Sequence, residues 1–246
     1  MATDHLDDGV VARQRPFHGV DVGIILLDSD LPRPVGDIGN AETFAFPVAF
    51  DVADDVTPTG VVEGGSKGLY PALEASGRRL VDRGVKAVST SCGFLASFQG
   101  ELAAALGVPV ATSSLLQVPQ VLTLLGPDDL LAVVAINKST LDDLDLAAVG
   151  ITEAHRKRLV VVGMEGTEHF YRVITQGHGD LHLDTARREV VEACQQAVAD
   201  EPRIRAFVFE CTNLPPYAAA VKQATGLPVW DAISMVEWLR DGVSRH

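Results

Sequence analysis

The chain has 246 residues, with 33 acidic side chains against 20 Lys and Arg, and a formal net charge of −13 at pH 7. A surface this acidic repels phosphate backbones and anionic lipids, so we expect no nucleic-acid or membrane partner. The 47% hydrophobic and 22% charged content is typical of a globular protein rather than a disordered one. The acidic start of the chain does not resemble a signal peptide, and three cysteines cannot build a disulfide framework. We therefore expect a cytoplasmic protein.

Strand-like and helix-like segments alternate along the chain. An apolar run over residues 20–27 is typical of a strand buried on both faces, and residues 44–50 predict a short edge strand because they contain Pro47. The other predicted strands cover residues 86–91, 108–112, 130–136, 159–163, 205–210 and 227–230. The predicted helices cover residues 66–83, 94–106, 139–149, 184–200, 215–225 and 232–241. This alternation predicts an α/β fold with parallel sheets flanked by helices.

An internal repeat is the most informative feature of the sequence. Cys92 and Cys211, which are 119 residues apart, each lie 5 residues after an alanine and 15 residues before a Gly-x-Pro-Val. In both places a strand comes before the cysteine, and a helix and a second strand follow it. We infer a duplication that gives two pseudo-symmetric halves, each contributing one cysteine.

Both cysteines are expected at the carboxyl end of a strand and the start of a helix, where parallel α/β sheets bind ligands. A helix start offers unpaired N–H groups that lower the pKa of a thiol and that can hold a carboxylate. Two thiols that face each other across a cleft between the halves can remove a proton from one face of a carbon and return it to the other. Such a reaction inverts a stereocentre without a cofactor.

Simpler explanations apply to other residues. Cys194 lies on an amphipathic helix and is expected in the core. No metal site is expected, because neither repeat cysteine has a CxxC partner and because glycines beside His178 and His182 break the helix that would pair them. Glu165 is expected at a strand end, either tuning the pKa of Cys211 or exposed to solvent. Asn137 and Ser139 follow the second-half strand and can bind the substrate carboxylate; in the alternative, Ser139 is a helix cap.

The paired cysteines, the Cys211-Thr-Asn-Leu-Pro-Pro run and the Gly-Leu-Pro-Val after it resemble the aspartate/glutamate/hydantoin racemase superfamily. The resemblance covers residues 20–240. It implies two Rossmann-like domains with the active site in the cleft between them, and a cofactor-independent proton transfer at a carbon next to a carboxylate. In this family the strand after each cysteine's helix joins the opposite domain, which implies one domain of residues 1–107 and 227–246 and another of residues 108–226.

The resemblance also implies roles for individual residues. Asp28 and Ser29 match an Asp-Ser pair that assists the first cysteine and the substrate, and Thr212 matches a hydroxyl residue that binds the substrate carboxylate. Two departures change the expected substrate. Gly93 and Phe94 replace the Asn-Thr of amino-acid racemases, and Asn213 replaces the His found in glutamate racemases.

The Cys-Gly-Phe sequence, with the run from Asp28 to Ile38, is more similar to the branch of the superfamily that includes dimethylsulfoniopropionate lyases. There, a thiolate removes the proton next to a carboxylate and a β substituent leaves. Arg33 and Asp37 lie in the same Pro/Gly-rich loop, which is either a lid over the cleft or a surface loop.

Three hypotheses follow for function. The first is a racemase or epimerase of a small amino acid or related carboxylate that uses Cys92 and Cys211 as opposed acid and base. The second is a lyase on the same scaffold. The third is a protein that binds a small acid without reaction. A homodimer is expected only from the family.

Overall fold

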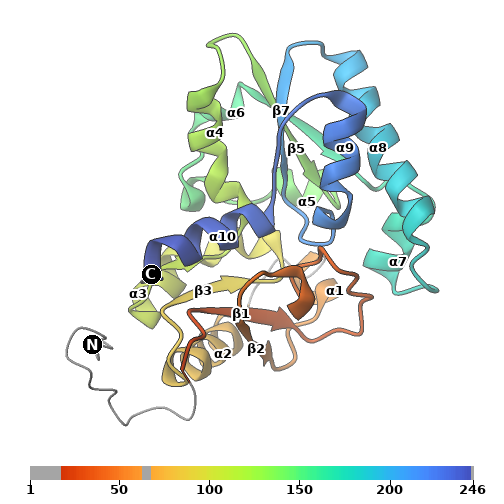
Figure 1. Ribbon diagram of the computed structural model, residues 1–246. Coiled ribbons are helices and arrows are strands. Elements are labelled where there is room, and N and C mark those ends of the chain that lie inside the picture. Colours follow the sequence, from red (N-terminus) through yellow and green to blue (C-terminus); the bar gives the residue numbers. More distant parts are fainter. Residues whose placement is uncertain (1–17, 63–67, 245–246) are drawn as a thin grey trace.

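The computed structural model describes residues 18–62 and 68–244, which form two stacked lobes with one parallel sheet each (Figure 1). Residues 1–17, 63–67 and 245–246 lie outside the described part. The expectation that the start of the chain is not a signal peptide concerns the first of these ranges. The first sheet has the order β2-β1-β3-β4 and the second has the order β6-β5-β7-β8. The strands are β1 (Val22–Leu27), β2 (Val48–Ala53), β3 (Ala87–Thr90), β4 (Val110–Ala111), β5 (Leu130–Ala135), β6 (Leu159–Gly163), β7 (Ile204–Phe209) and β8 (Val229–Trp230).

Helices cover both faces of each sheet. The α-helices are α1 (Pro58–Val62), α2 (Tyr70–Asp82), α3 (Gln99–Leu106), α4 (Val118–Leu124), α5 (Lys138–Asp142), α6 (Glu153–Arg156), α7 (Phe170–Gln176), α8 (Leu183–Asp200), α9 (Ala218–Thr225) and α10 (Ala232–Val243). Short 3-10 helices are η2 (Ala41–Thr43), η3 (Gly93–Phe98), η4 (Ser114–Gln117), η5 (Leu146–Val149) and η6 (Pro215–Tyr217). No helix in the described ranges is long and apolar enough to cross a membrane.

The apolar runs become the central strands, as predicted. β1 and β5 occupy equivalent positions in the two sheets, and β5 is buried along its whole length. In each sheet the central strand pairs in parallel with the strand that leads to a repeat cysteine, β1 with β3 and β5 with β7. All strand pairs in both sheets are parallel. The predicted α/β class with two pseudo-symmetric halves is confirmed.

The strand exchange implied by the resemblance is wrong. β4 pairs with β3 and β8 pairs with β7, so the strand after each cysteine's helix stays in the sheet of that cysteine. The chain crosses to the other lobe one element later. Ser114 Oγ donates to the Phe209 carbonyl in the second lobe (2.6 Å), and α10 packs against β1, β3 and β4 in the first. We therefore propose that the lobes divide near residues 113 and 231.

The two crossings lie side by side. Gln117 Nε2 donates to the Asp231 carbonyl (2.9 Å), and Ser234 Oγ donates to Gln117 Oε1 (3.0 Å). Asp231 also caps α10, because its carboxylate accepts from the backbone N–H groups of Ile233 and Ser234. These contacts fix the start of α10 against the start of α4 and hold the lobes in one orientation.

Some predicted boundaries differ from the structure. The edge strand predicted at 44–50 begins only at Val48 and runs to Ala53, because Pro47 cannot donate to the ladder. The helix predicted at 139–149 is split into α5 and η5, since Asp145 caps a new turn by accepting from the N–H of Ala147. The sequence analysis did not predict α1, α4, α6 and α7, which are short and, for α1 and α4, begin beside prolines.

A substitution at Gly36 tests how closely the loop of residues 31–40 packs against the second lobe. Its φ is +103°, and a Cβ there would lie 2.9 Å from the Cα of Pro216 in the other lobe. Gly177 is also left-handed, with φ +65°, but it faces open space. We expect Gly177→Ala to lower the free energy of unfolding by about 1–2 kcal/mol through backbone strain alone. Gly36→Ala should cost about 1–3 kcal/mol more because of the close contact. Urea unfolding of both variants measures the difference. Equal losses in the free energy of unfolding would contradict the close packing of the loop against Pro216.

Candidate active site

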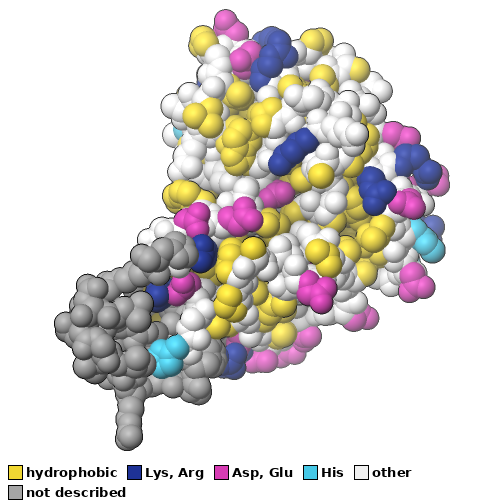
Figure 2. Space-filling view, in the orientation of Figure 1, with side chains coloured by type: hydrophobic (Ala, Val, Ile, Leu, Met, Phe, Trp, Pro, Cys, Tyr) yellow, Lys and Arg dark blue, Asp and Glu magenta, His cyan; other side chains and the backbone are white. Residues whose placement is uncertain are grey.

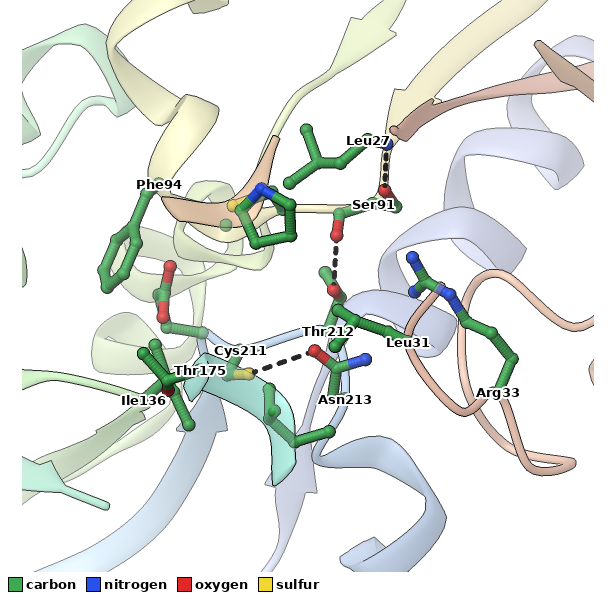
Figure 3. Close-up of a pocket in the computed structure, with 15 residues that line it drawn as sticks. Leu27, Leu31, Arg33, Ser91, Phe94, Ile136, Thr175, Cys211, Thr212 and Asn213 are labelled. Atoms are coloured by element: carbon green, nitrogen blue, oxygen red, sulfur yellow. Dashed lines mark hydrogen bonds between the residues drawn. The ribbon is translucent and has the colours of Figure 1, made fainter. Parts of the chain in front are cut away.

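A pocket opens between the lobes at the carboxyl ends of the strands, and both lobes line it (Figure 3). The first lobe contributes Leu27, Leu31, Arg33, Pro58, Ser91, Cys92, Gly93 and Phe94. The second contributes Ile136, Ile174, Thr175, Glu210, Cys211, Thr212 and Asn213. The pocket therefore exists only where the two halves of the repeat meet, which is where parallel α/β sheets bind ligands.

The structure brings the two repeat cysteines into this pocket. Cys92 follows β3 and caps the short helix η3, and Cys211 follows β7. Cys92 is partly exposed and Cys211 is 6% exposed, and neither forms a disulfide. Both cysteines line this one pocket, and a charge on Cys92 raises the pKa of Cys211. Cys194 is fully buried in α8, as expected of a core residue.

The thiols are not the acidic thiols that helix starts suggested. Burial raises the pKa of Cys92 to about 12, and the charge of Glu210 adds to this effect. The backbone N–H groups of Phe94 and Leu95 and the nearby Arg33 lower it only in part. Burial, with Glu210, likewise raises the pKa of Cys211 well above its usual value. Desolvation thus outweighs the helix start and favours the neutral thiol at both cysteines.

Glu210 is a functional candidate that the sequence analysis missed. It ends β7 directly before Cys211 and is 1% exposed, and burial raises its pKa to about 8. Neither carboxylate oxygen has a hydrogen-bond partner among the described residues. The sequence feature that could have identified it is an acidic residue directly after the apolar run Ala206-Phe-Val-Phe. Such a position predicts burial, and buried acids are rare unless they have a role.

Gly93 leaves the space that this carboxyl group occupies. A Cβ at residue 93 would overlap both Glu210 Oε1 and the Glu210 carbonyl oxygen. Phe94, next in the chain, is 1% exposed and lines the pocket. The Cys-Gly-Phe departure from the racemase sequence is therefore explained physically: glycine admits the carboxyl and phenylalanine provides an apolar wall.

A chain of polar contacts joins the loop of residues 31–40 to the second cysteine. Arg33 Nη1 pairs with Asp37 Oδ1 (2.9 Å), and Asp37 Oδ2 accepts from Asn213 Nδ2 (2.7 Å). Asn213 Oδ1 in turn accepts from Cys211 Sγ at 3.8 Å. Asp37 is fully buried. The loop thus covers the pocket instead of lying free on the surface, and Asn213 orients the Cys211 thiol.

Thr212 has a different partner from the one expected. Its hydroxyl donates to the Ser91 carbonyl across the lobe boundary (2.7 Å), and Ser91 Oγ accepts from the Leu27 N–H (3.0 Å). The Thr212 proton is committed to this bond, so the hydroxyl has no proton to donate to a substrate carboxylate. Arg33 is the positively charged side chain of the pocket lining and is better placed for that role.

Five predicted site residues lie outside the pocket lining: Asp28, Ser29, Asn137, Ser139 and Glu165. Asp28 and Ser29 are exposed, since the chain turns away after β1 and leaves Leu27 and Leu31 facing the pocket. Asn137, and not Ser139 as in the capping alternative, caps α5 by accepting from the Thr140 N–H (3.0 Å); it also accepts from Ser139 Oγ (2.7 Å). Glu165 is exposed and accepts from the Lys138 N–H (3.3 Å).

Comparison with known proteins gives both sequence relatives and fold relatives. A dimethylsulfoniopropionate lyase of Durusdinium sp. clade D is 28% identical over 244 residues, covering 94% of this chain and 79% of that protein. Dimethylsulfoniopropionate lyase 7 of Emiliania huxleyi is 32% identical over 228 residues, covering 87% of this chain and 64% of that protein. The chain thus spans less than two thirds of the second relative. No family model matches the chain.

Solved structures show the same architecture. Unliganded arylmalonate decarboxylase superposes with a TM-score of 0.57 at 18% identity, covering 91% of this chain and 92% of that one. Aspartate racemase of Picrophilus torridus superposes with a TM-score of 0.56 at 12% identity, covering 91% and 94%. The chain has the aspartate/glutamate racemase fold. The predicted resemblance to dimethylsulfoniopropionate lyases is confirmed by the sequence relatives, and the predicted racemase-like fold is confirmed by the solved structures.

The buried Glu210 carboxyl makes folding stability depend on pH in a defined direction. Its pKa is raised from 4.5 to about 8, so the folded protein holds a proton that the unfolded chain releases between these values. Stability from this group is present below pH 4.5 and is lost as the pH rises toward 8. Gln mimics the protonated carboxyl, so Glu210→Gln should match the wild type at pH 5 and be more stable by about 2–4 kcal/mol at pH 9. Urea unfolding at both values measures this, and a constant difference would contradict the raised pKa.

Proposed function

We propose that the protein is a lyase that cleaves a β-sulfonium carboxylate such as dimethylsulfoniopropionate, with a cysteine thiolate as the base. The observation that carries the proposal is the pocket itself, in which two thiols, one arginine and an apolar wall converge between the lobes. The two sequence relatives described above, both dimethylsulfoniopropionate lyases, support the same reaction.

The proposed step is an elimination. A thiolate of the Cys92 and Cys211 pair takes the proton next to the carboxylate, and the electron pair of that C–H bond becomes the C=C bond. The C–S bond breaks, and its electrons leave on sulfur as a neutral sulfide. The products are the sulfide and an α,β-unsaturated carboxylate, and the proton remains on the cysteine until solvent removes it. Because the leaving group departs neutral, no acid is needed to protonate it.

Arg33 has two roles in the proposed elimination. Its guanidinium lines the pocket beside Cys92, where its charge favours the thiolate. It can also bind the substrate carboxylate, and a carboxylate held by a cation withdraws charge as the adjacent carbon loses its proton. The pairing with Asp37 leaves other N–H groups of the guanidinium for a bound anion.

A racemase or epimerase is the second candidate, and one observation favours it. The two thiols reach the pocket from opposite halves of the repeat, as proton transfer between two faces of a carbon requires. Both reactions begin with loss of the same proton. The two reactions differ in the number of cysteines they need. Racemisation uses both, one as base and one as acid, whereas elimination needs a single base.

Proton NMR in D2O distinguishes these reactions. We expect the wild type, given dimethylsulfoniopropionate, to produce vinyl signals and dimethyl sulfide. Cys92→Ser and Cys211→Ser should lose about two or more orders of magnitude in rate for the cysteine that acts as base, because a hydroxyl ionises far less readily than a thiol. Cys194→Ala, in the core of α8, is the control and should keep the wild-type rate per folded molecule.

Other outcomes identify the alternatives. Deuterium exchange with loss of optical purity in a chiral carboxylate, without vinyl product, would establish a racemase. Full activity in both serine variants would exclude cysteine as the base. Unchanged binding of a carboxylate in both serine variants, with no exchange and no product, would leave a binding protein.

A further inference from the structure

The unpartnered carboxyl of Glu210 is the feature of the pocket that elimination by a cysteine does not itself use. The side chain is 1% exposed, yet neither oxygen accepts or donates a hydrogen bond within the described residues. A buried polar group without a partner costs about 1–3 kcal/mol or more. Such a cost persists where the group has a ligand to meet, and Glu210 lines the pocket.

The surroundings of Glu210 suit one kind of ligand. Apolar side chains form much of the remaining wall: Leu27, Leu31, Phe94, Ile136 and Ile174. A cation that carries alkyl groups is weakly hydrated, so it loses little on entering such a wall, and its charge matches a carboxylate. The Phe94 ring adds a surface that attracts alkylated cations through its π system. A compact ammonium group would instead need hydrogen-bond acceptors that an apolar wall does not offer.

We propose that Glu210 is a specificity-determining residue whose carboxylate receives an alkyl-substituted onium group, while Arg33 receives the carboxylate of the same zwitterionic ligand. This inference rests on the proposed function for the identity of the site and goes beyond it by assigning each charge of the substrate to a side chain. It also explains the glycine at residue 93, since any side chain there would displace the carboxyl group.

Proton release is a consequence that can be measured. Burial raises the pKa of the Glu210 carboxyl to about 8, so this group holds a proton at neutral pH when no cation is bound beside it. A bound cation favours the carboxylate, so binding below pH 8 should expel this proton, and affinity for the cation should rise with pH up to about 8. The other ionisable groups around the site are the Cys92 and Cys211 thiols, Arg33 on the loop, Asp37 behind it, and Tyr217, whose pKa burial raises to about 12.

These neighbours do not account for the proton. Burial raises the pKa of Cys92 to about 12 and that of Cys211 well above its usual value, so both thiols stay protonated at pH 6.5 even when a bound cation lowers these values. Asp37 is paired with Arg33 at 2.9 Å and with Asn213. The released proton is therefore assigned to Glu210, and replacing that residue should abolish the release.

Calorimetry with two probes of the same shape tests the assignment. The first probe is the zwitterion 3-(trimethylammonio)propanoate, and the second is the anion 4,4-dimethylpentanoate, which has carbon in place of nitrogen. We call them the cationic and the neutral probe after the charge at this quaternary atom. We expect the wild type to bind the cationic probe about tenfold or more tightly than the neutral probe, as for a buried charge pair. Titrations at pH 6.5 in buffers of different ionisation enthalpy should show about one proton released with the cationic probe only.

Two variants complete the experiment. Glu210→Gln, which mimics the protonated carboxyl and should therefore fold, is expected to lose both the preference and the proton release while keeping its affinity for the neutral probe. Glu237→Gln removes the same charge from the exposed face of α10 and should behave as the wild type. Thermal melting of each variant checks that it is folded.

The results separate this inference from the proposed function. A Glu210→Gln protein that still prefers the cationic probe, or a wild type that binds neither probe or prefers the neutral one, would overturn the inference. If the wild type cleaves dimethylsulfoniopropionate but shows no Glu210-dependent preference, only the inference fails. If it selects the cationic probe through Glu210 but forms no vinyl product, only the lyase reaction fails.

Discussion

The burial of one carboxyl group, that of Glu210, in the pocket that also holds both thiols is the constraint on which the rest of the site depends. With the side chain 1% exposed and no hydrogen-bond partner among the described residues, its negative charge is costly. Burial and, in second place, the charge of Glu210 raise the pKa of both Cys92 and Cys211, so all three groups favour their neutral forms. A bound cation lowers all three pKa values, and Glu210, whose pKa of about 8 lies closest to neutrality, is the group that ionises. Binding of the onium group is thereby coupled to release of the Glu210 proton.

This coupling depends on the way the lobes meet. Each thiol comes from a different sheet, and the hydrogen bond from Thr212 to the Ser91 carbonyl joins the segments that carry them. The loop of residues 31–40 adds a second link, because Asp37 binds Arg33 on one side and Asn213 on the other. Any rotation of one lobe against the other breaks these bonds. The surface over both lobes carries scattered acidic side chains, in keeping with the net charge of −13 (Figure 2).

The sheets and the position of the pocket could be predicted from the sequence, because long apolar runs and an internal repeat are strong signals. Long apolar runs specified the central strands, and the repeat around Cys92 and Cys211 specified two equivalent sheets whose carboxyl ends meet. The pocket position followed from that topology. Gly93, Phe94, Thr212 and Asn213 were identified because they adjoin the cysteines in the chain, and all four line the pocket.

The remaining features depend on three-dimensional packing that sequence patterns do not encode. In the sequence, Glu210 is indistinguishable from an exposed acid at the end of a strand. Only the three-dimensional structure shows that Gly93 and apolar side chains surround it. Asp28 and Ser29 match a motif, yet the turn after β1 directs them to solvent. The two-residue strands β4 and β8 gave no signal of the sheet they would join, and the point of crossing depends on contacts of Gln117 with α10.

The most direct test of the account is the protonation state of Glu210 in the ligand-free protein. Infrared difference spectra between the wild type and Glu210→Gln, recorded from pH 6 to pH 9, isolate the carbonyl stretch of a protonated carboxyl group. The account predicts that this band is present at pH 6 and disappears with a midpoint near pH 8, as burial of the group requires. A carboxylate band already complete at pH 6 would contradict it, because Glu210 would then be solvated or paired and would have no proton to release when an onium group binds.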